Sequence, residues 1–101
     1  MMSVTTLADI IEPLKNKKKF YADHFGVTRF GIFGSFVEGM QTADSDIDIV
    51  VEMRPDKKNL HNFLQLKRLL EEEFNRSVDL GLEHTLKPMI RERLKDKIVY
   101  V

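Results

Sequence analysis

The sequence predicts a small α/β (α+β) domain in which helices cover one face of a small mixed sheet while the other, open face carries carboxylates. Apolar residues recur at helical spacing, and short runs rich in β-branched residues lie between these segments. The expected order is helix, strand, short helix, strand, helix, strand, helix. With 101 residues, 43% of them hydrophobic and 32% charged, we expect a single domain over residues 1–101 with one core.

Helical segments are expected before the first strand. Hydroxyl side chains precede apolar residues at helical spacing, so a helix should begin near Thr5, with Pro13 as a break late in it. A second helical stretch is expected from Lys15 to Phe25, ended by Gly26. Its basic cluster is interpreted as a solvated helix face, with attraction of a triphosphate or an acidic partner as the alternative. The cluster consists of Lys15, Lys17, Lys18 and Lys19.

The first strand, expected over residues 27–33, leads directly into Gly34-Ser35. Glycine here indicates a backbone position where a side chain would obstruct a ligand or where φ must be positive. Ser35 stands where a short helix over residues 36–40 can begin, so its hydroxyl and unpaired backbone N–H groups are available to phosphate oxygens. Gly-Ser alone is too common a dipeptide to indicate a phosphate site.

Ten residues further on, Asp46-Ile47-Asp48 opens a run with the alternation of a strand, residues 46–52. Residues two apart in a strand face the same way, so both carboxylates should project from one surface. Two like charges this close raise each other's pKa, and a divalent cation between them removes that cost. Oxygen ligands without nearby Cys or His favour Mg²⁺ or Mn²⁺ over zinc.

The next segment is predicted to be an amphipathic helix capped by Asn59, followed by a third strand. The apolar stripe of the helix is interpreted as core packing and comprises Leu60, Phe63, Leu64, Leu66, Leu70 and Phe74. The strand is expected over residues 77–81, with Asp79 on the face opposite to its apolar neighbours. A lone strand Asp is more often solvent-facing or a local cap. If this strand lies beside that of Asp46 and Asp48, three carboxylates converge.

A short helix beginning near Pro88 and a terminal strand or docking segment over residues 98–101 are expected to complete the chain. The terminal segment is interpreted as an edge strand or core plug, with a partner-binding tail as the alternative. His24, His61 and His84 share no metal-ligand spacing and are interpreted as surface or capping residues.

The composition argues against several classes of protein. With 16 basic and 16 acidic side chains, the formal charge of zero argues against a general nucleic-acid binder. The absence of cysteine excludes disulfides and Cys-ligated metals. The sequence contains no apolar run of membrane-spanning length and no signal-peptide pattern, so we expect a cytoplasmic protein.

Gly34-Ser35, Asp46-Ile47-Asp48 and the later Asp79 together resemble the active-site signature of the DNA polymerase beta-type nucleotidyltransferase superfamily. In size the chain resembles the minimal nucleotidyltransferases (MNT) of prokaryotes, including the antitoxins of HEPN–MNT toxin–antitoxin systems. This resemblance implies a polymerase-beta-like fold in which Asp46 and Asp48 bind two Mg²⁺ and Gly34 and Ser35 hold the triphosphate of ATP. It also implies that Asp79 helps to activate the acceptor hydroxyl, as a base or as a third metal ligand.

The reaction implied by the resemblance is AMPylation, the transfer of AMP from ATP to a tyrosine of a HEPN partner, which is a toxic ribonuclease. Longer relatives carry an acceptor-binding domain that has no counterpart here, so a protein partner or a second copy should supply the acceptor surface. Relatives often have basic residues after Gly-Ser, where this chain has Phe36, Val37 and Glu38. We therefore expect Arg29, Lys57 or a partner's side chain to attract the phosphates.

An alternative hypothesis is a nucleotide-sensing or binding module that neutralises a partner without catalysis. The three acids Asp46, Asp48 and Asp79 favour the enzyme, because a module that only binds does not need clustered carboxylates.

Overall fold

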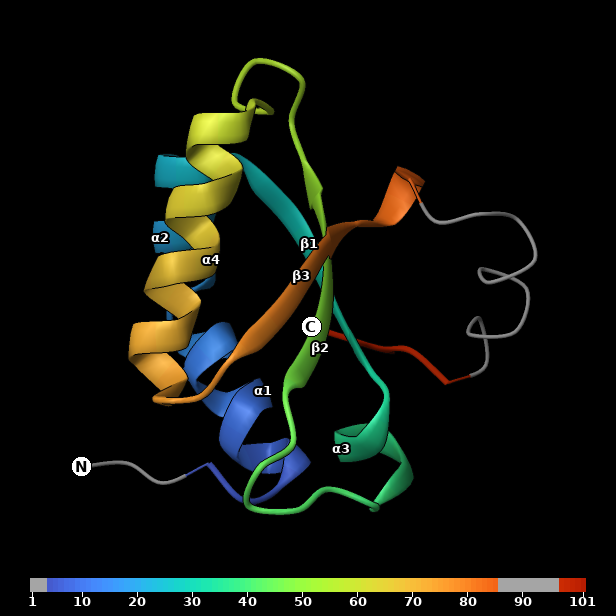
Figure 1. Cartoon of the computed structure of the whole chain (residues 1–101). Coiled ribbons are helices and arrows are strands. Elements are labelled where there is room, and N and C mark those ends of the chain that lie inside the picture. Colours follow the sequence, from blue (N-terminus) through green and yellow to red (C-terminus); the bar gives the residue numbers. More distant parts are fainter. Residues whose placement is uncertain (1–3, 86–96) are drawn as a thin grey trace.

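The computed structural model describes residues 4–85 and 97–101, and these form a two-layer α/β structure (Figure 1). The sheet has the strand order β3-β2-β1-β4. β1 is antiparallel to both β2 and β4, whereas β2 and β3 are parallel. The strands are β1 (Val27–Phe33), β2 (Ile47–Met53), β3 (Val78–Leu82) and β4 (Val99–Tyr100).

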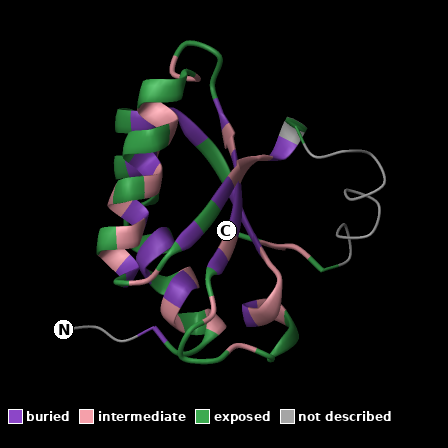
Figure 2. Cartoon of the chain, viewed as in Figure 1, coloured by how far each residue is buried: buried purple, intermediate pink, exposed green. Residues whose placement is uncertain are grey.

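Helices α1 (Leu7–Asn16), α2 (Lys18–Phe25) and α4 (Leu60–Phe74) lie together on one side of the sheet (Figure 1). The short helix α3 (Ser35–Glu38) lies apart from them, where the chain leaves β1. Buried residues of α1, α2 and α4 and of the strands β1, β2 and β3 form one core, and Figure 2 shows where buried residues lie along the chain. The predicted mixed sheet with helices on one face is confirmed.

Local sequence sets most of the helix ends. At the start of α1, the Thr6 N–H donates to Asp9 Oδ2 at 3.1 Å and the Asp9 N–H donates to Thr6 Oγ1 at 3.4 Å, which is a capping box. Gly26 ends α2 with φ of 68°, as predicted. The break expected at Pro13 is wrong, because Pro13 lies buried inside α1 and the chain turns at Lys17 instead. Pro13 has no N–H, so one hydrogen bond of the helix is not made at this position, yet α1 continues to Asn16.

Helix α4 begins at the predicted cap, where Asn59 Oδ1 accepts a hydrogen bond from the Asn62 N–H at 2.9 Å. Leu66, Leu70 and Phe74 are buried as predicted, and Phe63 packs partly buried against the core. The prediction that Leu60 and Leu64 belong to the core is wrong, since these side chains are 72% and 51% exposed. At 3.6 residues per turn, Leu64 lies well outside the face centred on Leu70, and Leu60 lies in the first turn.

The C-terminal segment is an edge strand, as predicted, because β4 pairs with β1. The buried carboxylate of Glu83 accepts a hydrogen bond from the Tyr100 hydroxyl and pairs with Arg29 at 2.5 Å. The Arg29 guanidinium lies 4.2 Å from the centroid of the Tyr100 ring. These contacts hold β4 against β1 and the end of β3. The helix expected near Pro88 lies outside the described residues.

None of the helices in the described part of the chain has the length and apolar character needed to cross a membrane.

We expect Leu70→Ala to lower the free energy of unfolding by about 2–5 kcal/mol, because it opens a cavity in the core. Leu64→Ala on the same helix should change it by less than about 0.5 kcal/mol, since Leu64 is exposed. Urea denaturation of both variants measures this difference. Equal losses would contradict the assignment of the buried face of α4.

Candidate active site

Two acidic strands lie side by side in the sheet. β2 and β3 pair in parallel, and Asp48 is directly opposite Asp79 in their register. Ile47 and Ile49, on either side of Asp48, are fully buried against the helices. Asp48 therefore projects from the open face of the sheet, as the alternation predicts. The expectation that the strands of Asp48 and Asp79 lie side by side is confirmed, although the two residues are far apart in the sequence.

Asp46 immediately precedes β2 and is exposed. Its carboxylate lies close enough to Asp48 to influence the titration of that residue, as does the carboxylate of Asp79. The structure thus gathers all three predicted acids at the end of the sheet where β2 begins.

Gly34 lies directly against Asp48. Its backbone has φ of 78° and ψ of −149°, a conformation that essentially only glycine adopts. A Cβ atom at this position would lie 2.1 Å from Asp48 Oδ2, which no real contact allows. The predicted need for positive φ is confirmed, and the group that a side chain would obstruct is the Asp48 carboxylate. The Gly-Ser turn and the acidic strand therefore form one unit.

Ser35 is the first residue of α3. The Val37 and Glu38 N–H groups both donate to the Gly34 carbonyl at 3.1 Å, which closes the first turn. The Phe36 side chain is buried in the core and anchors this short helix. Ser35 is therefore held next to Gly34 and, through it, next to Asp48.

Burial, followed by the charges of Asp79 and then Asp46, raises the pKa of Asp48 above its ordinary value of 3.8. The charged form of Asp48 is consequently disfavoured in the folded chain. A cation between the carboxylates would relieve this repulsion, and an all-oxygen donor set suits Mg²⁺ or Mn²⁺.

Among residues 4–85 and 97–101, no three acidic or histidine side chains are arranged closely enough to hold a metal ion by themselves. Mg²⁺ is commonly bound by one or two carboxylates, with substrate phosphates and water completing its coordination. The residues present fit a cation that binds together with a nucleotide.

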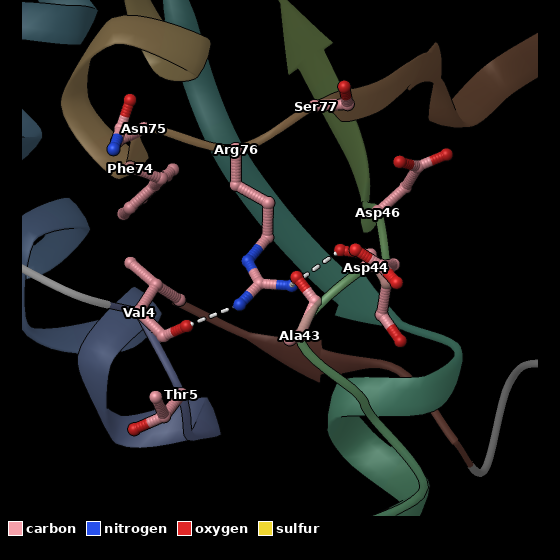
Figure 3. A pocket seen from close by; sticks show the side chains of 10 residues that line it. Val4, Thr5, Ala43, Asp44, Asp46, Phe74, Asn75, Arg76 and Ser77 are labelled. Atoms are coloured by element: carbon pink, nitrogen blue, oxygen red, sulfur yellow. Dashed lines mark hydrogen bonds between the residues drawn. The ribbon is translucent and has the colours of Figure 1, made fainter.

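A cavity of about 530 Å³ opens beside Asp46, between the start of β3 and the loop over residues 42–45 (Figure 3). Arg76 reaches from the end of α4 toward this loop and toward Val4 (Figure 3). Arg76 is not among the site residues predicted from the sequence. The signal that was available is its position, between the end of a helix and the predicted Asp79 strand.

The basic residues expected to attract phosphates lie elsewhere. Arg29 is opposite Glu52 in the sheet, and its hydrogen bond to Glu83 raises its pKa. Lys57 packs against Gly26. It follows the end of β2, whereas Asp48 lies near the start of that strand. Neither prediction is supported, because Arg29 lies near the start of β1 and Lys57 follows β2, both at the end of these strands opposite to Asp48.

Other charged side chains lie at the surface as expected. The predicted lysine cluster is exposed, and Lys17 pairs with Glu73 at 2.8 Å. His24 and His61 are exposed, whereas the side chain of His84 lies outside what the structure describes. Glu38, an acid where relatives often have basic residues, is paired with Lys97 at 3.1 Å.

Comparison with known proteins finds a matching domain family and similar proteins. The model of the nucleotidyltransferase domain family matches residues 14–101. A protein adenylyltransferase, MntA, of Thermococcus cleftensis is 36% identical over 100 residues, covering 99% of this chain and 100% of that protein.

Solved structures share the fold. A candidate minimal nucleotidyltransferase superposes with a TM-score of 0.79 at 28% identity, covering 97% of this chain and 98% of the other. An MNT antitoxin in complex with a tri-AMPylated HEPN toxin of Shewanella oneidensis gives a TM-score of 0.63 at 17% identity, covering 90% and 70%. These likenesses confirm the predicted fold.

We expect Gly34→Ala to destabilise the chain more than Gly39→Ala does. Both glycines have positive φ, 78° and 72°, but a Cβ at Gly39 has no atom within 4 Å. Gly39→Ala should cost about 1 kcal/mol, and Gly34→Ala a further 1–3 kcal/mol or so from the clash with Asp48. Chemical denaturation of the variants measures both costs. In a double-mutant cycle, Asp48→Ala should remove part of the cost of Gly34→Ala, and strict additivity would contradict direct contact.

We expect Asp48→Asn to raise the melting temperature of the metal-free chain at pH 7. The variant keeps the shape of the side chain and removes the negative charge of Asp48, a carboxyl group whose pKa is raised in the folded chain. The gain should narrow as the pH falls toward 3.8, because protonation of Asp48 removes the same charge. Thermal unfolding in the presence of a chelator at several pH values tests this.

Glu52→Gln is the matched control for that experiment. Glu52 lies on the same strand, opposite Arg29, so its charge is attracted rather than repelled. It should bring no gain in melting temperature. A lower melting temperature for Asp48→Asn than for the unmodified chain would contradict the repulsion between the acids.

Proposed function

The chain belongs to the nucleotidyltransferase domain family, and we propose that it is a Mg²⁺-dependent protein adenylyltransferase that transfers AMP from ATP to a hydroxyl of a partner protein. The observation that carries this proposal is the pairing of Asp48 with Asp79 directly beside the Gly34-Ser35 turn. This arrangement brings a pair of acids and a phosphate-approach turn to the same end of the sheet.

The nature of the acceptor is inferred from the relatives. The Thermococcus cleftensis protein is named as an adenylyltransferase of proteins, and the two chains match along almost their entire lengths. The Shewanella oneidensis neighbour is an antitoxin bound to an AMPylated HEPN toxin. We infer that the partner of this chain is a HEPN-type toxin, that the acceptor is one of its tyrosines, and that modification makes the chain an antitoxin. It would act in the cytoplasm, where ATP is available.

The proposed chemistry is an attack of the acceptor oxygen on the α-phosphorus of ATP. The new bond joins that oxygen to phosphorus, the bond from phosphorus to the bridging oxygen breaks, and pyrophosphate leaves. Asp79, facing the open side of the sheet beside Asp48, would take the proton of the acceptor hydroxyl or serve as a third metal ligand. Ser35, at the start of α3, would hold phosphate oxygens through its hydroxyl and backbone N–H.

Asp46 and Asp48 would hold the metal, as two Mg²⁺ ions or Mn²⁺ in their place. When bound, the metal neutralises triphosphate charge and lowers the pKa of the acceptor hydroxyl. The open face of the sheet leaves the carboxylates accessible to a second protein. We propose that this face receives the acceptor, and that the partner supplies the basic groups that Arg29 and Lys57 do not provide here.

We expect the chain, incubated with its HEPN-type partner, Mg²⁺ and labelled ATP, to label a partner tyrosine. Asp46→Asn and Asp48→Asn should each reduce labelling by at least about 100-fold, the loss typical when a group that stabilises transition-state charge is removed. Label on the partner, followed by peptide mass spectrometry, measures both the rate and the modified residue. The same assay with all four nucleoside triphosphates defines the nucleotide preference.

Glu52→Gln, on the same strand but beside Arg29, is the control and should label normally. Full labelling by either Asp variant would contradict the catalytic assignment. If both variants still neutralise the toxin without any labelling, the chain is instead a module that acts by binding.

A further inference from the structure

We propose that Arg76 is a positioning residue that holds the loop before Asp46 in the geometry required for binding metal and nucleotide. This inference rests on the proposed function. It assigns a role to a side chain outside the acids and the Gly-Ser turn.

The guanidinium of Arg76 connects two separate parts of the chain by hydrogen bonds to backbone carbonyls. Nη1 donates to three carbonyl oxygens of the loop over residues 42–45, and Nη2 donates to the Val4 carbonyl at 2.6 Å. The three loop distances are 3.0 Å to Thr42, 3.2 Å to Ala43 and 2.7 Å to Ser45. Ser45 is the residue before Asp46, so the last of these bonds fixes the backbone directly at the first acid.

Arg76 also reaches the Gly-Ser helix. Its guanidinium carbon lies 5.2 Å from the centroid of the Phe36 ring, a cation–π contact. Phe36 follows Ser35 and is buried in the core. One side chain therefore contacts both the loop that delivers Asp46 and the helix that begins with Ser35.

The backbone of Arg76 is itself fixed, so its side chain works from a rigid base. Asn75 has φ of 50° and ends α4, and the Arg76 N–H donates to the Glu71 carbonyl at 3.3 Å. On the other side, the Ile47 N–H donates to the Ser77 carbonyl at 2.9 Å, which joins this turn to the start of β2. Backbone hydrogen bonds thus fix the chain at Arg76 and at Ile47, the residue after Asp46, and so set the distance between Arg76 and Asp46.

The chemistry of arginine suits this role. Its planar guanidinium carries five N–H donors in a fixed arrangement, so it can serve several carbonyls at once. Lysine presents three donors at a single point on a flexible stem and cannot reproduce the same contacts. We therefore expect Arg76→Lys to retain part of the function and Arg76→Ala to lose more.

The first test measures the Mg²⁺ concentration that gives half-maximal transfer of AMP to the partner. We expect it to rise about 10-fold or more for Arg76→Ala, as is typical when a residue that orients metal ligands is lost, and less for Arg76→Lys. Two control variants should keep the wild-type value. Leu70→Ala is destabilised through the core, which lies on the opposite face of the sheet from Asp48, and Arg54→Lys alters a surface arginine paired with Asp56.

The second test does not depend on activity. Amide hydrogen exchange followed by mass spectrometry should show faster exchange in a peptide covering residues 42–47 for both Arg76 variants. Leu70→Ala should not show this local effect beyond its global change. If Arg76→Ala does not fold, Arg76→Lys carries both measurements.

An unchanged Mg²⁺ requirement together with unchanged exchange over residues 42–47 would overturn the role of Arg76. If the unmodified chain transfers no AMP, the proposed function fails, and hydrogen exchange still decides whether Arg76 positions the loop. Faster exchange with an unchanged Mg²⁺ requirement would make Arg76 a structural residue only and would also overturn the proposal.

Discussion

The register between β2 and β3 holds Asp48 opposite Asp79. Asp46, just before β2, is close enough for its charge to act on Asp48 as well. The fold therefore keeps carboxylates of like charge together against their mutual repulsion. The isoleucines beside Asp48 make this arrangement stable, because their burial against α1, α2 and α4 prevents the strand from turning over. The core on one face therefore supplies the free energy that keeps charges crowded on the other.

The same constraint explains the Gly-Ser turn. β1 runs antiparallel to β2 and ends opposite Asp48, so the next residue must pass against that carboxylate. Gly34 lies so close to the Asp48 carboxylate that no Cβ would fit between them, and its backbone has a conformation that other residues avoid. The unusual backbone conformation and the close approach together place the Gly-Ser turn in direct contact with Asp48.

Features set by local sequence were predictable, whereas features set by packing were not. The alternation before and within β2, the Asn59 cap and the glycine at the end of α2 follow from neighbouring residues alone. Pro13 and Leu64 were misassigned because burial depends on how each helix sits on the sheet. The acids could be singled out by spacing and resemblance, while Arg76 could not, since its partners are carbonyl oxygens, which every residue possesses.

The parallel pairing of β2 with β3 requires the chain to cross over through α4 before Asp79 can reach Asp48. Asp79 therefore joins Asp46 and Asp48 only through contacts between segments distant in sequence, and loop closure has to precede such contacts. No nascent or partly unfolded form lacking β3 can present the complete acidic site. Under the proposed function, activity would therefore require the completed fold, and local opening of β3 would remove Asp79 from the acids before the remaining structure is lost.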